Sequence, residues 1–307
     1  MNPAYSVILF TTASGAGYGL LALLGLVGFN HGPVSIFAFG VTALFIALGL
    51  ITIGLLSSTL HLGHPERAWR AFSQWRSSWL AREGVAAVAT YIPAISFGTV
   101  WTDIIHAPTL VGPLGLLTGI MCAITVFCTA KIYSTLKTIR AWNNALTEPV
   151  YLAFALATGG ALMAAIATVF GRYQIFQTIL TVAAVILVAI LKYLYWRSID
   201  SAERTHTMAA ATGLGAGVRQ WEMPHTSENY IMKEMGFAVA RKHALKLRNA
   251  VFILLLITLL ALAACQITPW FSFIAAPAVL IAAVVERWLF FAEAQHVVSL
   301  YYGAEKA

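Results

Sequence analysis

Eight long runs of mostly apolar residues dominate this sequence, and each is long enough to cross a lipid bilayer as a helix. A bilayer offers no water to backbone N–H and C=O groups, so a spanning chain must form helices or a closed barrel, and runs of this length are helical. We place the runs at residues 5–29, 36–60, 85–105, 110–136, 150–170, 174–196, 249–269 and 272–296. With 60% hydrophobic and only 10% charged residues, the chain is predicted to be an all-α integral membrane protein, a single domain over 1–307 folded as an eight-helix bundle.

The basic residues lie almost entirely in the loops at one end of the predicted bundle. Residues 61–84, 131–149 and 197–248 carry most of them, whereas the turn at 171–173 carries only Arg172 and the turns at 30–35 and 106–109 carry none. Because short cytoplasmic loops are enriched in Lys and Arg, we expect the basic end and both termini to be cytoplasmic, in a bacterial inner membrane. The net charge of +7 then reflects topology and contact with anionic lipids, and it gives no support to nucleic-acid binding.

The soluble part of the chain is too small to hold a catalytic domain. Its longest segment is the predicted cytoplasmic loop at 197–248, which ends in a basic amphipathic stretch at 229–248 that is typical of an interfacial helix. The three cysteines lie inside apolar runs without CxxC spacing, so we expect no metal site and no iron–sulfur cluster in this chain. Any chemistry on a soluble substrate must therefore come from another subunit.

The loop at 61–84 is the densest polar segment next to an apolar run. It begins at His61, ends beside Glu83 and contains His64. Its other notable side chains can anchor the loop at the headgroup level or contact a partner, and they are Arg67, Arg70, Arg76, Arg82, Trp69, Trp75 and Trp79. Anchoring does not explain His61 and Glu83, which lie where the second run ends and the third begins.

A histidine and a carboxyl group at a membrane edge suit the chemistry of a quinone. A quinone is a flat apolar ring whose two carbonyl oxygens gain or lose protons as electrons move. Histidine titrates near neutral pH, and a carboxyl group in an apolar setting holds its proton more tightly, so the two can donate hydrogen bonds and relay protons. We therefore predict a quinone-binding and proton-relay site that includes His61, Glu83 and His64.

Ionisable residues also occur in the last apolar run, where we expect Glu286 and Arg287 to lie well inside the bilayer or to face a cavity. Glu286 and Glu293 are two helical turns apart and share a face, with His296 close to it. Such a stripe forms either a structural ion-pair network or the wall of a site, so these three residues are second candidates for the quinone site. Small residues crowd the first run at 11–19, which favours close helix packing, although they also leave room for a flat ligand.

The histidine positions argue against a cytochrome, because a b-type haem needs axial ligands that face each other inside the bundle. Of the eight histidines, only His61, His64 and His296 cluster at one membrane edge. One haem there is geometrically possible, whereas a pair of haems stacked across the membrane lacks ligands.

A short motif connects the chain to a known family. The residues His61-Leu-Gly-His-Pro-Glu-Arg-Ala-Trp69, followed by Ala81-Arg-Glu83, resemble the membrane-anchor subunit of dimethyl sulfoxide reductase. The resemblance implies a haem-free anchor that exchanges electrons with ubiquinone or menaquinone through His61 and Glu83. It also implies two partners, a four-cluster iron–sulfur subunit and a molybdopterin catalytic subunit. The arginine-rich loop would dock the iron–sulfur subunit, and its tryptophans would set the depth of docking.

The side of the membrane on which the partner subunits bind distinguishes between relatives of this kind. The basic motif loop predicts a cytoplasmic partner, so the chain is most similar to the membrane subunit of the quinone-linked sulfite dehydrogenases that face the cytoplasm. On this hypothesis electrons run from sulfite to the quinone pool. The alternatives are a quinol-oxidising anchor of a dimethyl sulfoxide or other oxoanion reductase, and an eight-helix transporter with no redox role.

Overall fold

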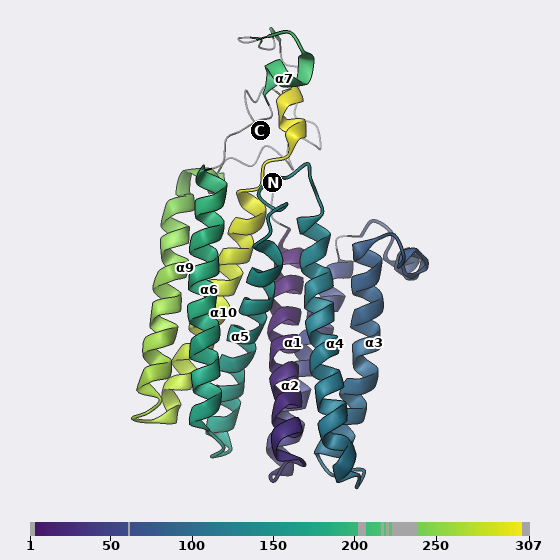
Figure 1. The fold of residues 1–307 in the computed structure, drawn as a ribbon, viewed down its shortest axis with the longest axis vertical. Helices are drawn as coiled ribbons and strands as arrows, with labels where there is room; N and C mark the ends of the chain where they lie inside the picture. Colours follow the sequence, from purple (N-terminus) through teal and green to yellow (C-terminus); the bar gives the residue numbers. More distant parts are fainter. Residues whose placement is uncertain are drawn as a thin grey trace.

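The structure is a computed structural model that describes residues 4–60, 62–201, 207–215, 218, 221–222 and 239–302. In these residues eight helices are long and apolar enough to cross a membrane, as the sequence predicted (Figure 1). They are α1 (Tyr5–His31), α2 (Phe37–Thr59), α3 (Trp79–Trp101), α4 (Pro108–Ser134), α5 (Thr147–Val169), α6 (Ile175–Ser201), α9 (Val239–Ala264) and α10 (Ser272–Ala292). Shorter helices are η1 (Pro65–Gln74), α7 (Met208–Thr212), η2 (Pro269–Phe271) and η3 (Val297–Tyr302).

No strand forms in the described part of the chain, where the β pairing is an isolated bridge between Ile139 and His296. The all-helical prediction is therefore confirmed for these residues. The predicted amphipathic stretch at 229–248 lies mostly outside the described residues, and α9 begins at Val239 within it.

The third helix begins earlier than the apolar pattern indicated, at Trp79 rather than at residue 85. Ser78 caps it, because its hydroxyl accepts a hydrogen bond from the backbone amide of Ala81. Charged and aromatic residues in the first two turns lower the local hydropathy, so the hydropathy pattern does not indicate that the helix begins here. As a result Glu83, which was expected at the edge of the loop, lies inside the helix.

Helix α1 is the central element of the bundle and packs against α2, α4, α5 and α10. Its small residues permit this packing, which confirms the structural role predicted for them. A Cβ atom built on Gly19 would overlap the carbonyl oxygen of Ala155 in α5. A Cβ atom on Gly25 would overlap the carbonyl oxygen of Gly115 in α4. Side chains at either glycine would force the helices apart.

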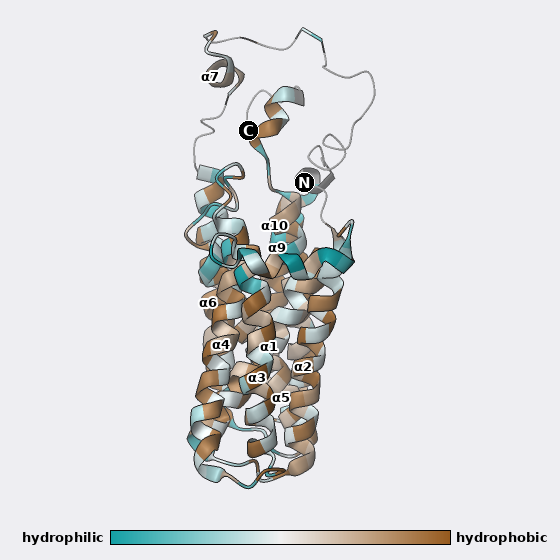
Figure 2. Cartoon of the chain, turned by 90° about the vertical axis from the view of Figure 1, so that its right-hand side faces the viewer, coloured by the Kyte–Doolittle hydropathy of each residue, from teal (hydrophilic) through white to brown (hydrophobic). Residues whose placement is uncertain are grey.

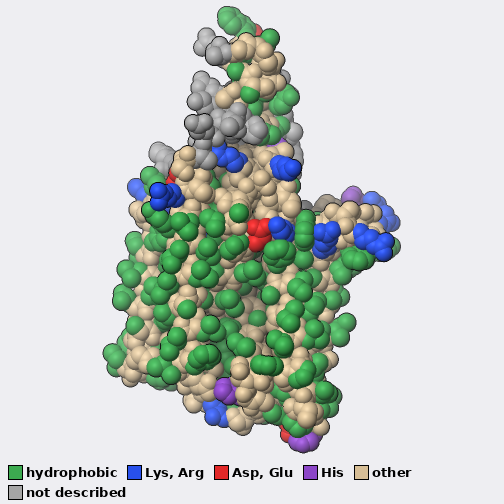
Figure 3. All heavy atoms as spheres, in the orientation of Figure 1, with side chains coloured by type: hydrophobic (Ala, Val, Ile, Leu, Met, Phe, Trp, Pro, Cys, Tyr) green, Lys and Arg blue, Asp and Glu red, His purple; other side chains and the backbone are tan. Residues whose placement is uncertain are grey.

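The helices form two groups that meet at the middle of the molecule. Helices α1–α4 make one group, and α5, α6, α9 and α10 make the other, with α1, α4, α5 and α10 in contact across the boundary (Figure 1). Segment η1 stands out from the end of the bundle where α2 finishes and α3 begins. Hydrophilic residues concentrate at that end (Figure 2). On the face drawn in Figure 3 most Lys and Arg side chains also lie there.

Candidate functional site

Glu83 is buried in the second turn of α3, with 5% of its surface exposed. Its Oε1 atom lies 3.2 Å from the hydroxyl oxygen of Thr129 in α4, and that hydroxyl also lies 3.0 Å from the carbonyl oxygen of Thr125. A threonine hydroxyl carries a single hydrogen. Both contacts are complete at once when the Glu83 carboxyl group carries a proton and donates to Thr129. The geometry therefore suits a carboxyl group that takes up and releases a proton.

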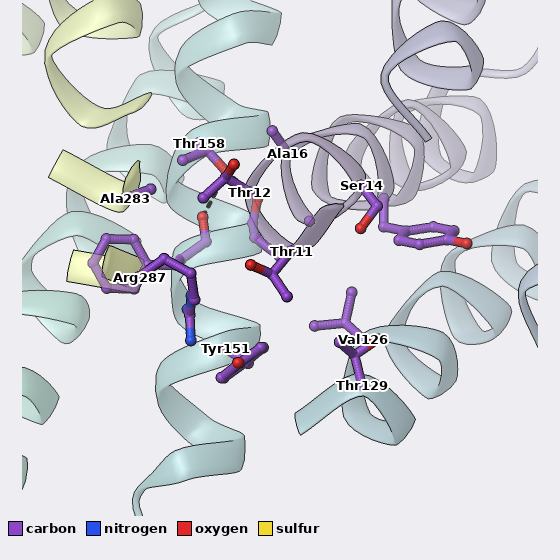
Figure 4. A pocket seen from close by; sticks show the side chains of 14 residues that line it. Thr11, Thr12, Ser14, Ala16, Val126, Thr129, Tyr151, Thr158, Ala283 and Arg287 are labelled. Carbon is purple, nitrogen blue, oxygen red and sulfur yellow. Dashed lines mark hydrogen bonds between the residues drawn. The ribbon is translucent and has the colours of Figure 1, made fainter. Parts of the chain in front are cut away.

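Thr129 also lines a small polar cavity between α1, α4, α5 and α10, with a volume of about 20 Å³. A space of this size suits a water molecule. Its polar wall consists of hydroxyls and one guanidinium group, from Thr11, Thr12, Ser14, Tyr18, Thr129, Tyr151, Thr158 and Arg287. In Figure 4, Arg287 and Tyr151 lie on one side of this space and Thr129 on the other. The cavity therefore lies at the boundary between the two groups of helices, and both groups contribute residues to its wall.

Three buried polar atoms at this cavity make no hydrogen bond to any described residue. They are the hydroxyls of Tyr18 and Tyr151 and the Nη1 atom of Arg287. Buried polar groups in folded proteins are almost always satisfied by protein or by ordered water, so unsatisfied groups mark a place for a ligand or a solvent molecule. Their convergence on one cavity makes this the strongest candidate site in the described part of the chain.

An apolar cleft of about 80 Å³ adjoins the polar cavity. The two share Tyr18, Val126 and Ala155 as lining residues. The cleft runs between α1, α4 and α5 and includes Ala123 and Leu156, which are exposed on the surface that would face lipid. An apolar molecule dissolved in the bilayer can therefore approach the polar cavity sideways, without crossing an aqueous phase.

The two glutamates at the end of the last helix form ion pairs with different helices. Glu286 is fully buried and pairs with Lys192 of α6 at 2.8 Å and with its neighbour Arg287 at 3.2 Å. Glu293 pairs with Arg248 of α9 at 2.9 Å, and burial raises the pKa of its carboxyl group against the opposing effect of that arginine. Neither glutamate lines the polar cavity, whereas Arg287 does.

His296 lies beyond α10 and fixes the C-terminal segment. The Nδ1 atom of His296 accepts a hydrogen bond from the backbone amide of Val298. The backbone of His296 forms the isolated β-bridge with Ile139. Burial lowers the pKa of the imidazole. His296 is not among the residues that line the cavity.

Of the two histidines in the motif, the structure describes His64. His61 lies outside the described residues. His64 is exposed, and its Nδ1 atom lies 3.1 Å from the carboxylate of Glu66. The structure therefore places Glu83 in a buried site and His64 on the surface, and does not bring these two together.

The arm formed by η1 and the turn that follows it presents arginines stacked on tryptophans. Arg70 lies over Trp69, and Arg76 lies over Trp75, with the guanidinium carbons 5.7 and 5.4 Å from the ring centres. Both tryptophans are at least half exposed. Arg82 differs, because it lies in α3 and donates hydrogen bonds to the carbonyl oxygens of residues 75 and 76, which hold the end of the arm. It also covers Trp79, at 4.3 Å.

Three residues that build the cavity, Tyr18, Thr129 and Tyr151, were not predicted from the sequence, whereas Arg287 was expected to lie inside the bilayer or to face a cavity. Hydroxyls inside apolar helices are common, and nothing in their spacing shows that three separate helices bring them together. The only signal was Arg287, a cation inside an apolar run. Such residues are costly in a membrane and mark functional or structural sites.

Fold and site together define a multi-pass membrane protein with a buried polar cavity that adjoins an apolar cleft at the helix surface. The model of the DMSO reductase anchor subunit (DmsC) matches residues 1–303, and the chain belongs to this family. Over 331 aligned residues it is 31% identical to the C subunit of sulfite dehydrogenase from Allochromatium vinosum, covering 98% of this chain and 99% of that protein. It is 28% identical over 106 residues to the C chain of anaerobic dimethyl sulfoxide reductase from Haemophilus influenzae, covering 34% and 37% of the two proteins. No solved structure matches the chain.

The family confirms the resemblance drawn from the motif around His61 and Glu83. The chain is a membrane-anchor subunit related to the C subunit of sulfite dehydrogenase. Its relatives are subunits of oxidoreductase complexes, which favours a redox role over that of a transporter.

Proposed function

We propose that this chain is the quinone-reactive subunit of a membrane oxidoreductase and that Glu83 exchanges protons with the quinone. The observation that carries the proposal is the position of the Glu83 carboxyl group. It is buried, it is hydrogen-bonded to a wall residue of the polar cavity, and that cavity adjoins a cleft open to lipid. A quinone needs an apolar route for its tail and a polar end for its ring oxygens, and this arrangement supplies both.

The chemistry follows from the two compartments. The isoprenoid tail lies along the apolar cleft, and the ring reaches its junction with the cavity at Tyr18. Reduction of a quinone to a quinol consumes two electrons and two protons. The electrons come from the partner subunit. One proton passes from the Glu83 carboxyl group to a ring oxygen through the hydroxyl of Thr129, which lies between that carboxyl group and the cavity. The second proton, and the proton that restores Glu83, are taken up from the bulk aqueous phase.

The direction of electron flow that we propose is from sulfite to quinone. The support is the similarity to the C subunit of sulfite dehydrogenase, which extends over nearly all of both proteins. The basic end of the bundle supports a cytoplasmic position for the partners, in a bacterium, by the positive-inside rule. The partners are an iron–sulfur subunit and a molybdopterin catalytic subunit, with the exposed arm as the docking surface. The second candidate is electron flow from quinol to a sulfoxide reductase, which the family match favours.

The test of the site compares Glu83→Gln with Glu148→Gln in the intact complex. Glu148 is a suitable control, because it lies at the same end of the bundle, pairs with Lys131, and lines neither the cavity nor the cleft. Electron transfer to a short-chain quinone analogue should fall by at least tenfold in Glu83→Gln only. Reduction of a soluble artificial acceptor should remain at the wild-type rate in both variants. Wild-type quinone reduction by Glu83→Gln would refute the assignment.

The test of direction uses the same complex with sulfite as the electron donor. We expect sulfite-dependent reduction of the quinone analogue. Absence of that reaction, together with quinol-dependent reduction of dimethyl sulfoxide, would replace the first candidate with the second.

A further inference from the structure

Three charged side chains form a fully buried cluster beside the polar cavity. Lys192, Glu286 and Arg287 are each no more than 4% exposed, and the carboxylate of Glu286 contacts both cations. Among the described residues Glu286 is the one carboxylate in contact with these two cations, while Glu293 pairs with Arg248 and acts on Lys192 from a distance. Two buried cations that share one contacting carboxylate are costly, and ionisable groups inside a membrane protein usually mark a functional site.

The positive charge is directed toward the cavity. The ammonium group of Lys192 lies between Glu286 and the rings of Tyr195 and Trp196, at 3.9 and 4.3 Å from the ring centres. It therefore interacts with this carboxylate and these two rings and does not face the cavity. Arg287 has only part of its guanidinium group against Glu286, and it lies 3.6 Å from the ring centre of Tyr151. Its Nη1 atom has no hydrogen-bond partner among the described residues.

The opposite wall of the cavity carries Thr129, which connects to Glu83. The cavity thus has a fixed cation on one side and a proton-carrying carboxyl group behind the other side (Figure 4). These two groups come from α10 and α3, on different sides of the boundary between the helix groups.

We propose that Arg287 is a second catalytic residue of the quinone site, resting on the function proposed above. As electrons arrive, negative charge builds up on the ring oxygens of the quinone. The Arg287 guanidinium group stabilises that charge at one oxygen, while Glu83 donates its proton to the other through the hydroxyl of Thr129. Glu286 is a positioning residue that holds the guanidinium group, and Lys192 keeps Glu286 from neutralising it. The site therefore favours a ring that carries negative charge over a neutral ring of the same size.

The experiment measures this preference as binding, without turnover. The intact complex is titrated with two probes of similar shape: a hydroxynaphthoquinone, which is an anion at neutral pH, and a methylnaphthoquinone, which is neutral. The wild-type complex should bind the anionic probe more tightly. Arg287→Gln should reduce the ratio of the two affinities at least tenfold, with the affinity for the neutral probe nearly unchanged. Arg287→Lys should keep most of the preference.

Two more variants complete the experiment. Lys192 does not line the cavity, and Lys192→Met leaves Glu286 and Arg287 as a neutral pair, so this variant should weaken the preference several-fold. It provides the test if Arg287→Gln does not assemble. Lys131→Met, which removes a cation at the same end of the bundle that does not line the cavity, should leave the preference unchanged.

The outcomes separate the two proposals. An unchanged preference in Arg287→Gln and in Lys192→Met overturns the role of Arg287 and leaves the quinone site intact. Failure of the wild-type complex to bind either probe in competition with a long-chain quinone overturns the proposed function, and the role of Arg287 with it.

Discussion

Replacing Glu286 with glutamine should destabilise the bundle more than any other single change in the buried charge cluster. The substitution keeps the shape of the side chain and removes its charge, which leaves Lys192 and Arg287 buried without a counter-ion. Breaking a buried ion pair by removing one partner costs roughly 3–5 kcal/mol. Because both cations are almost fully buried and share this single carboxylate, we expect a value in that range.

Lys192→Met is the informative comparison. It leaves Glu286 and Arg287 as a matched pair at 3.2 Å and puts an apolar side chain of similar length against the aromatic rings. The loss of the cation–π contacts costs about 1–2 kcal/mol, part of which is offset because an ammonium group no longer has to be buried. The order of stability should therefore be wild type, then Lys192→Met, then Glu286→Gln.

The assay is equilibrium unfolding of the full chain in mixed micelles, driven by a rising fraction of sodium dodecyl sulfate and followed by tryptophan fluorescence. Glu148→Gln is the control, because its ion pair with Lys131 is partly exposed and should contribute about 0–1 kcal/mol. A free energy of unfolding for Glu286→Gln within about 1 kcal/mol of the wild type, or an equal loss of stability in Lys192→Met, would contradict the expected order.

Three other predictions address the site, the packing and the C-terminal segment. Thr129→Val should slow quinone reduction several-fold, because it removes the hydroxyl that bonds to the uncharged Glu83 carboxyl group and such a bond contributes about 0.5–1.5 kcal/mol. Thr118→Val on the same helix should have little effect, and a wild-type rate in Thr129→Val would contradict the role of Thr129. Gly19→Val should separate α1 from α5 and destabilise the protein by roughly 1–3 kcal/mol in the micelle assay, and a neutral result would show that the close approach is absent. The pKa of His296 is lowered by burial, so the neutral imidazole stabilises the folded segment above the ordinary pKa of about 6.5, and this stabilisation is lost as the pH falls through the lowered value. The protection factors of the amides at residues 296–302, which allow for the slower intrinsic exchange at lower pH, should therefore fall as the pH drops below about 6.5 in the wild type. The same fall in His296→Leu would refute this origin.

The number and approximate position of the spanning helices could be predicted because hydropathy is a local property of the chain. The prediction was least accurate at α3, where Trp79, Arg82 and Glu83 occupy the first two turns of a helix that Ser78 caps. Polar residues at a helix end look like loop residues in a hydropathy argument. The motif containing Glu83 still identified the family, because a motif depends on residue order and not on where a helix begins.

The sequence by itself determined that the chain is an eight-helix membrane protein of the anchor family, with Glu83 as a candidate proton carrier. Only the tertiary structure decided which groups meet that residue. Glu286 and Arg287 are adjacent in the chain, yet one turns toward Lys192 on α6 and the other toward the cavity. Tyr18, Thr129 and Tyr151 are far apart in sequence and converge there because small residues let α1 pack closely against α4 and α5. A site assembled from four helices depends on how those helices pack against one another. Helix packing depends on the whole bundle, so it could not be predicted from the sequence of any one segment.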